Sequence, residues 1–339
     1  MIFSPHTLEL SLDLDRFKYK ELKSIAFDKA KGSHWINKSK SKSGEYCTVY
    51  TDKVLTSSGV TVEYHESFLR YSVKLIVNPS KVLGGDDIPK LWKPTDRNIK
   101  SLLRSLKAHI KDYFDSEHKL NDFKLTRIDL TVNIDVGSRE NVSHYIKILH
   151  RLGRVKGFAP KYKKSNKWIN KNLSFDLKGK TKPIEFSAYD KEAQSEMKAA
   201  KGILRVEIRL MNIEIKDSNI SGQIKDLSKR SKEIFMILFQ RIIPRGDHYS
   251  KKQATALIED NIADIIPNKR ERDNTLGRMK ELLELIPTKK SLHLAQKAFA
   301  YRDVNRIMET FAKLNVYPVT IGKNMKFNYL KSLYSYLEE

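Results

Sequence analysis

Apolar and polar residues alternate along many stretches of the N-terminal two-thirds of the chain, and this period of two is typical of strands that bury one face. The first stretch carries Leu8, Leu10, Leu12 and Leu14, with charged or polar residues between them. The same pattern predicts further strands at residues 46–51, 60–63, 70–77, 124–136, 184–189 and 203–211. Together these strands predict a mixed or antiparallel central sheet.

Apolar residues spaced by three and four positions predict helices between the strands. Residues 99–113 carry one such face, and Ser138 can cap a helix over residues 139–149. Another helix is predicted to end at Gly202, just before the last strand. Residues 31–44 are predicted to form a basic loop that is rich in Ser and Gly.

The character of the chain changes after about residue 215, where the strand patterns fade. Pro244, Pro267 and Pro287 are expected to separate a series of helices. These helices are predicted at residues 230–243, 252–265, 271–285, 290–300 and 302–314. We therefore predict an α+β domain at residues 1–215, followed by an all-helical domain at residues 216–339.

Basic residues outnumber acidic ones, because 64 Lys and Arg against 41 Asp and Glu give a formal net charge of +23. Such an excess favours a polyanionic partner, and nucleic acid is the usual one because each phosphate contact releases a counterion. A membrane is disfavoured, because no apolar run approaches the roughly 20 residues of a spanning helix. The N-terminal residues do not resemble a signal peptide, and the single cysteine, Cys47, excludes an internal disulfide and indicates a reducing compartment.

Three predicted strands carry polar faces that suit phosphoryl transfer. Their polar positions are Arg127, Asp129, Thr131, Asn133 and Asp135 in the first, Glu185, Ser187 and Tyr189 in the second, and Arg205, Glu207 and Arg209 in the third. If the strands share a sheet and their polar faces agree, carboxylates, arginines and a tyrosine converge. For each strand taken alone, a merely solvated face is the commoner meaning of the alternation.

Cleavage of a phosphodiester needs an in-line nucleophile and neutralisation of charge on the phosphoryl oxygens. Asp129 and Glu207 offer hard oxygen ligands for Mg²⁺ or Mn²⁺, which would act as a Lewis acid and orient the phosphate. A tyrosine hydroxyl has an ordinary pKa of about 10 and needs help to attack near neutrality. Lys191, two residues after Tyr189, is suited to lower that pKa or to balance charge on the phosphate.

Tyr189 is one of 15 tyrosines, so spacing alone does not select it as the nucleophile. Its position favours it, because it ends a predicted strand on the polar face. The residue that follows, Asp190, can cap the next helix.

A basic segment interleaved with aromatic residues is the second sign of a nucleic-acid partner. Lysines contact phosphates, and aromatic rings stack on unpaired bases, although a solvated loop with buried aromatics is an equal alternative. The predicted DNA-binding residues are Lys161, Tyr162, Lys163, Lys164, Lys167, Trp168 and Lys171.

Several common catalytic motifs are absent from the sequence. There is no Gly-rich phosphate loop that ends in Lys-Ser or Lys-Thr, which excludes a P-loop ATPase, and there is no Gly-x-Ser-x-Gly. No His-x-His pair occurs, so the metal motif of histidine-type nicking enzymes is missing. His65 and Glu66 are adjacent potential ligands, but a lone histidine on a strand is more often structural.

Four segments, taken in order, resemble the filamentous-phage gene II/X family of replication initiators. They are RYSVKLIVNPSKVLGG at 70–85, LTRIDLTVNI at 125–134, FSAYDKEAQ at 186–194 and ILRVEIRLM at 203–211, with a weaker helical match around 300–318. The Tyr-x-Lys and Arg-Ile-Asp patterns also resemble rolling-circle plasmid initiators that lack paired histidines. The chain departs from the phage family in being much richer in lysine.

The resemblance implies a nicking-endonuclease-like catalytic domain that cuts one DNA strand at an origin and stays attached through a tyrosine. That tyrosine falls on Tyr189, beside Lys191. The Arg-x-Asp strand falls on Arg127 and Asp129, and the Arg-x-Glu strand falls on Arg205 and Glu207. Asp129 and Glu207 are then expected to hold the metal, while Lys191, Arg127 and Arg205 stabilise charge on the phosphate.

The resulting hypothesis is a rolling-circle replication initiator that nicks and rejoins origin DNA, either single-stranded or supercoiled, through a 5′-phosphotyrosine. It implies Mg²⁺ or Mn²⁺, no organic cofactor, a host helicase or polymerase as partner, and the cytoplasm of a bacterial host; the oligomeric state is left open. One alternative is a transfer relaxase or a transposase with the same chemistry. Another is a non-catalytic DNA-binding regulator of replication, which needs the basic face but not Tyr189.

Overall fold

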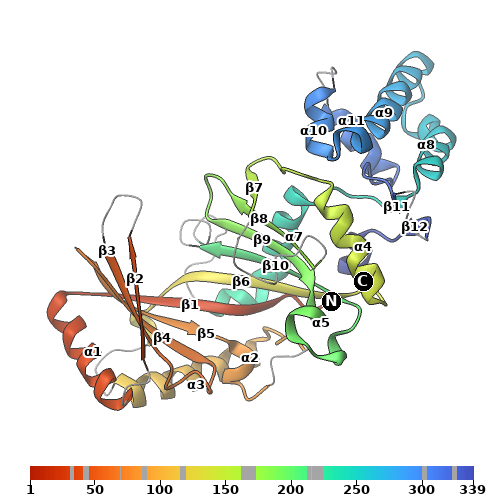
Figure 1. Cartoon of the computed structure of the whole chain (residues 1–339). Helices are drawn as coiled ribbons and strands as arrows, with labels where there is room; N and C mark the ends of the chain where they lie inside the picture. Colours follow the sequence, from red (N-terminus) through yellow and green to blue (C-terminus); the bar gives the residue numbers. More distant parts are fainter. Residues whose placement is uncertain are drawn as a thin grey trace. The chain divides into compact units, whose positions relative to one another are not determined.

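The chain forms two compact units that do not follow one another along the sequence (Figure 1). The N-terminal unit consists of Ile2–Val132 and Glu207–Phe235, and the C-terminal unit consists of Asn133–Val206 and Met236–Glu339, together with Met1. The computed structural model describes residues 1–30, 34–40, 46–68, 70–85, 90–114, 120–161, 173–211, 215, 224–299, 304–322 and 327–339.

Two strands contribute residues to both units, namely β6 (Lys124–Asp135) and β10 (Ile203–Met211). The long helix α7 (Leu227–Ile242) also has residues in both. The predicted boundary at residue 215 therefore does not coincide with the division into compact units, because residues 133–206 group with the helical segment that follows. The division into a catalytic and a helical functional domain stays a prediction.

The N-terminal unit is built on an antiparallel sheet with the strand order β2-β3-β4-β5-β1-β6. Its strands besides β6 are β1 (Ser4–Leu14), β2 (His34–Lys40), β3 (Tyr46–Asp52), β4 (Val60–Ser67) and β5 (Arg70–Val77). In the centre, Leu8 of β1 stands opposite Val77 of β5 and Ile128 of β6, and all three side chains are fully buried. Period-two alternation thus places one face of each strand in the core, as the sequence predicts.

Helices cover this core. They are α1 (Arg16–Ala30), α2 (Pro79–Val82) and α3 (Asp96–Phe114), and short 3₁₀ turns lie at Leu120–Asp122 and Ile224–Asp226. Helix α1 packs against β5, and its Tyr19 ring meets the ring of Tyr64 edge-on with centroids 6.2 Å apart. Helix α3 buries Leu102 and Leu106 along a single face, which confirms the helix predicted from their spacing.

The C-terminal unit continues with the strand order β6-β10-β9-β8-β7. Its further strands are β7 (Phe158–Pro160), β8 (Ser174–Gly179) and β9 (Ile184–Asp190). Helix α4 (Arg139–His150) packs against β8 and β9, and its cap is the predicted one, since Ser138 accepts a hydrogen bond from the Asn141 backbone. The ring of Phe186 contacts those of Phe175 and Phe239 on this helix-covered face of the sheet.

The remainder of the C-terminal unit is mainly helical. It contains α8 (Lys251–Ile265), α9 (Lys269–Lys289), α10 (Leu292–Ala298), α11 (Val304–Lys313), α12 (Leu333–Glu338) and a two-stranded ribbon of β11 (His248–Tyr249) and β12 (Tyr329–Leu330). Asp247 anchors the ribbon, because its carboxylate accepts hydrogen bonds from the Ser332 backbone at 2.6 Å and from the Asn315 amide at 3.0 Å. In the part of the chain that the structure describes, no helix is both long and apolar enough to cross a bilayer.

The α+β class and the helical C-terminal part are as predicted, but three local predictions are wrong. Residues 34–40, predicted to be part of a loop, form β2. Each of them pairs with a residue of β3, and such pairing between strands cannot be read from the alternation within one strand. The helix predicted to end at Gly202 is shorter, because α5 (Lys191–Ser195) ends at Ser195 and only a 3₁₀ turn follows at Lys198–Ala200. Pro287 does not end its helix, because α9 continues to Lys289 and a proline in the last turn removes only one backbone hydrogen bond.

Candidate active site

One face of the C-terminal sheet carries polar side chains, and the other packs against helices. In β9, Ile184, Phe186 and Ala188 are buried, so Glu185, Ser187 and Tyr189 face the other way. The alternation in β10 turns Leu204 and Val206 inward and places Arg205 on the polar side. Of the polar positions of the last two predicted strands, Glu185, Ser187, Tyr189 and Arg205 lie in the C-terminal unit, whereas Glu207 and Arg209 belong to the N-terminal unit.

Arg205 is a buried cation on this face. Its side chain is fully buried, and its Nε donates a hydrogen bond to Oδ1 of Asn133, on β6, at 2.8 Å. The other two guanidinium nitrogens, Nη1 and Nη2, are buried and have no hydrogen-bond partner among the described residues. Buried charged donors without acceptors are costly, and phosphoryl oxygens are the acceptors that a guanidinium fork matches best.

A carboxylate that the sequence reasoning missed lies on the neighbouring strand. Asp176 of β8 stands opposite Ser187 of β9 and accepts hydrogen bonds from the hydroxyls of Ser187 at 2.6 Å and Ser174 at 2.7 Å. The signal was present in the sequence, because Ser174, Asp176 and Lys178 alternate with Phe175 and Leu177. Both serine hydroxyls are thereby fixed on the polar face.

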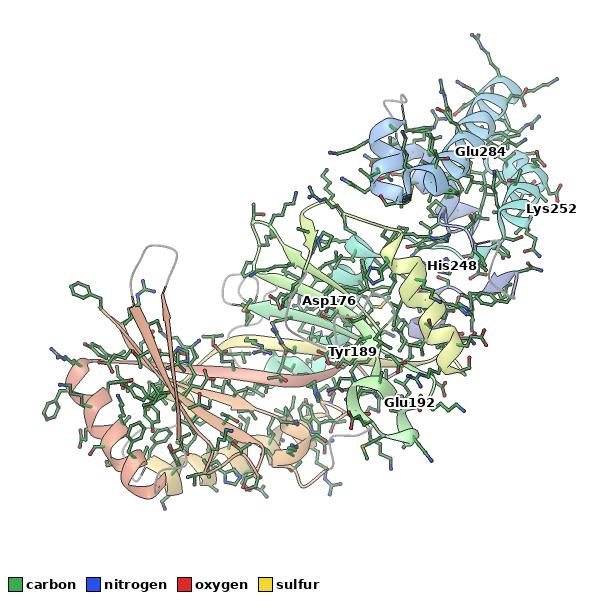
Figure 2. All side chains as sticks on the ribbon, viewed as in Figure 1. Asp176, Tyr189, Glu192, His248, Lys252 and Glu284 are labelled. Atoms are coloured by element: carbon green, nitrogen blue, oxygen red, sulfur yellow. The ribbon has the colours of Figure 1, made fainter. Side chains whose placement is uncertain are left out.

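Tyr189 lies where β9 meets the short helix α5 (Lys191–Ser195), and Figure 2 labels it there. Its side chain is half-buried. The predicted cap is confirmed, since the Asp190 carboxylate accepts a hydrogen bond from the Ala193 backbone at 3.0 Å and lies 3.6 Å from Nε of Arg139. The end of the strand, and with it the tyrosine, is therefore held by a capped turn.

Two charged side chains of α5 follow Tyr189. Lys191 is buried, and its ammonium group donates a hydrogen bond to Oε1 of Gln194 at 2.6 Å. Glu192, also labelled in Figure 2, has a buried Oε2 without a hydrogen-bond partner in the described part of the chain. Sequence reasoning missed Glu192, because nothing distinguishes it from other acidic residues of a first helical turn. A short 3₁₀ turn at Lys198–Ala200 leads on to β10.

Asp129 lies in the N-terminal unit, between two arginines. Nε and Nη2 of Arg127 lie 2.8 and 2.5 Å from its two oxygens, and Nε and Nη2 of Arg209, on β10, lie 2.9 and 3.0 Å from them. Burial alone would raise the pKa of the Asp129 carboxyl, but the hydrogen bonds and charges of the two arginines lower it below its usual value. Asp129 is thus a buried, ionised and fully bonded carboxylate.

A divalent cation does not fit at Asp129 in this arrangement. All lone pairs of a carboxylate are used by four donors, and two guanidinium groups stand where a cation would approach. No group of three potential ligands among His, Cys, Asp and Glu occurs within the described residues. Glu207 is half-buried on β10 and is engaged in other interactions, so its role as a metal ligand stays a prediction.

The pair His65 and Glu66 is not a ligand pair, because adjacent residues of a strand point to opposite faces. His65 bonds to the Glu63 carboxylate at 2.8 Å, and that hydrogen bond is the main reason why the pKa of Glu63 is lowered. Glu66 instead meets Lys23 at 3.5 Å. Both residues therefore have structural partners.

Most of the predicted DNA-binding segment lies outside the described residues. Lys161 is described, and its ammonium group forms an ion pair with Glu185 at 2.6 Å. The remaining predicted residues lie outside the described part of the chain; they are Tyr162, Lys163, Lys164, Lys167, Trp168 and Lys171. DNA binding by this segment stays a prediction.

Comparisons with known proteins place the chain in a family. A family model that describes the N-terminal part of a replication-associated protein, the gene II protein, matches residues 33–229, which is more than half of the chain. Among solved structures, a rolling-circle replication initiator protein from Geobacillus stearothermophilus matches with 14% identity over 71% of this chain and 84% of that one, at a TM-score of 0.37. No curated protein sequence matches the chain.

Proposed function

The chain belongs to the family of replication-associated proteins represented by the gene II protein, and from this premise we propose that it starts rolling-circle replication by nicking one DNA strand through Tyr189. The family supports a role in replication. The C-terminal unit supports the chemistry, because it contains a tyrosine at the end of β9, a buried arginine on β10 and a buried lysine on α5.

In the proposed reaction, Oη of Tyr189 attacks the scissile phosphorus in line with the leaving 3′-oxygen. A bond forms between the tyrosine oxygen and the 5′-phosphate, the bond to the 3′-oxygen breaks, and that oxygen takes up a proton and becomes a free 3′-hydroxyl. The tyrosine hydroxyl gives up its proton, and Glu192 is the residue of α5 that is chemically suited to accept it, because one of its carboxylate oxygens has no hydrogen-bond partner in the described structure. The same steps in reverse rejoin the strand.

Charge on the phosphoryl oxygens is neutralised, in this proposal, by Arg205 and Lys191. The single observation that carries the proposal is that Nη1 and Nη2 of Arg205 are buried and have no hydrogen-bond partner among the described residues, while its Nε bonds to Asn133. A preorganised donor of this kind stabilises a developing anion without reorganisation.

Arg127 was predicted to act on the same phosphate. Two of its three guanidinium nitrogens are bonded to Asp129, so we assign it a positioning role in the N-terminal unit. A requirement for Mg²⁺ or Mn²⁺ stays our prediction. Because Asp129 does not fit as a ligand, no step is assigned to the cation.

The test is the formation of a covalent adduct. Purified protein is incubated with single-stranded DNA that carries the origin, in the presence of Mn²⁺ or Mg²⁺, and is run on a denaturing gel. We expect a shifted protein–DNA band that is lost completely in Tyr189→Phe. The matched control is Tyr71→Phe, which removes a half-buried tyrosine hydroxyl in the N-terminal unit and should leave the band unchanged.

Two outcomes would contradict the proposal. A band that survives Tyr189→Phe would move the nucleophile to another residue. Tight DNA binding without any adduct, for every metal and origin fragment, would favour a non-catalytic regulator of replication instead.

A further inference from the structure

A cavity of about 620 Å³ lies within the C-terminal unit, between the turn after α4, the end of α7, and helices α10 and α11. We call it the helical groove. Most of its wall comes from residues 240–245, 292–296 and 305–312, which lie beyond the segment matched by the family model. Its volume is on the scale of a nucleotide-sized ligand, and it is separate from the residues proposed for strand cleavage.

The rim of the groove is positively charged. Arg154, Lys156 and Arg241 line it and are exposed, and within the described residues none of the three forms an ion pair. A fourth cation, Arg245, lies 4.7 Å above the Tyr334 ring and pairs with Glu338 at 3.0 Å. The groove therefore presents at least three cationic side chains that the fold does not use.

The charge of the surroundings is also reflected in His293, which lines the groove. Its pKa is lowered first by burial and then by the positive charges of Lys297, Arg154 and Lys180. Lys180 and Lys297 thus extend the cationic region beyond the groove itself. Among the residues that line the cavity, Glu309 is the one acidic side chain within the described structure.

The floor of the groove is apolar and its sides carry amides. The apolar side chains are those of Leu152, Val155, Ile242, Ile243, Pro244, Leu292, Met308 and Ala312. The amides belong to Gln240, Gln296 and Asn305. Sites for single-stranded nucleic acid combine cations that follow the phosphates with aromatic rings on which unpaired bases stack. Here the corresponding surface is aliphatic apart from Tyr334, the aromatic ring of the lining.

We propose that the helical groove binds single-stranded DNA, with phosphates at Arg154, Lys156 and Arg241 and bases over the apolar floor. This rests on the proposed function only in its choice of ligand, since a nicking initiator handles a displaced strand. A duplex exposes phosphates but keeps its bases stacked, so it would leave the apolar floor unused. The groove thus gives the protein a binding site for single-stranded DNA that does not depend on Tyr189.

The proposal is tested by DNA binding of the full chain. A fluorescent oligo(dT) of about 30 nucleotides is titrated with protein, and anisotropy is measured over a series of salt concentrations. The groove variant is Lys156→Ala with Arg241→Ala. The control is Lys252→Ala with Arg270→Ala, which removes the same charge from exposed positions on α8 and α9 that do not line the groove (Figure 2 labels Lys252).

We expect the groove variant to bind about 10-fold more weakly, with the slope of log affinity against log salt reduced by about 1.4 for two lost phosphate contacts. The control should stay within about twofold of the unaltered chain. Oligo(dT) that contains 4-thiothymidine should crosslink to peptides of the turn after α4 and of α10.

Equal losses in both variants would overturn the proposal, because they would show a general attraction by net charge. Displacement of the oligonucleotide by polyglutamate as readily as by unlabelled oligo(dT) would also overturn it, in favour of an acidic protein segment. Failure of the cleavage chemistry is distinguishable, because Tyr189→Phe should bind oligo(dT) normally and the groove variant should still form the covalent adduct at saturating DNA.

Discussion

In the N-terminal unit, Arg127 and Arg209 both donate to Asp129, whereas in the C-terminal unit Arg205 keeps two buried nitrogens without a partner among the described residues. Elsewhere on the N-terminal sheet, Lys74 pairs with Glu9 at 2.9 Å and His65 with Glu63. In the helical groove, Arg154, Lys156 and Arg241 are exposed and form no ion pair within the described residues.

This difference separates two uses of basic residues in a chain with a net charge of +23. A cation that is saturated by carboxylates stabilises the fold and has little left for an anionic ligand. A buried cation that the fold leaves without acceptors costs stability and gains hydrogen bonds when an anion binds, whereas an exposed unpaired cation costs little and remains available to an anionic ligand. Net charge alone does not distinguish the two uses.

The largest effect on stability is expected from Asp129→Asn, which leaves two arginines without their counter-ion. Removing one partner of a buried ion pair costs about 3–5 kcal/mol. Urea unfolding, followed by hydrogen exchange of N-terminal peptides, should show this loss in the N-terminal unit. The matched control is Glu284→Gln, because Glu284 belongs to an exposed pair with Lys251 and its loss should cost less than about 1 kcal/mol. Equal stability of Asp129→Asn and the unaltered chain would refute the structural role.

Arg205→Met should affect the reaction rate and not the stability. Replacing a buried cation that has no acceptor for two of its nitrogens among the described residues by an apolar side chain of similar size is expected to leave stability unchanged or to raise it by about 1 kcal/mol. The rate of adduct formation should fall by about 100-fold, as for the loss of one preorganised donor to a developing anion. The rate is measured by single-turnover quenching and the stability by urea unfolding. If Arg205→Met were less stable than the unaltered chain but formed the adduct at the same rate, the assignment of the two arginines would be reversed.

His248 provides the smallest expected effect and a third kind of basic group, which is buried and neutral. Burial lowers its pKa to about 4, and its ring stacks near Tyr317 with centroids 4.2 Å apart. In the unfolded chain this histidine has an ordinary pKa of about 6.5. The contribution of His248 to stability is therefore fully present above that pH and is lost as the pH falls from about 6.5 towards 4.

The loss should amount to about 2 kcal/mol at pH 5 relative to pH 7. It is measured by urea unfolding at the two pH values, with hydrogen exchange of peptides around β11 to localise it. His248→Phe, which keeps an aromatic ring but cannot be protonated, should be less sensitive to acid by this amount. The same acid sensitivity in both proteins would show that His248 does not titrate on unfolding.

The strands and caps of the candidate site were predictable because they follow from short-range patterns. Alternation in residues 184–189 and 203–211 identifies which side chains share a face, and Asp190 caps α5 as predicted. The family was also recognisable, since its four segments lie in order and all of them fall within residues 33–229, which the family model matches. Asp176 was missed although Ser174, Asp176 and Lys178 alternate with Phe175 and Leu177.

The amino-acid sequence by itself determined the α+β class, the polar faces of the strands and the excess of positive charge, because each depends on neighbouring residues or on composition. Tertiary structure decided which charges are paired. Asp129 meets Arg209 from 80 positions away, and Arg205 meets Asn133 from 72 positions away. Arginines therefore close an ion cluster in one unit, while in the other a buried arginine keeps two nitrogens without a partner among the described residues. Pairing between distant strands fixes these partners, and no local pattern records it.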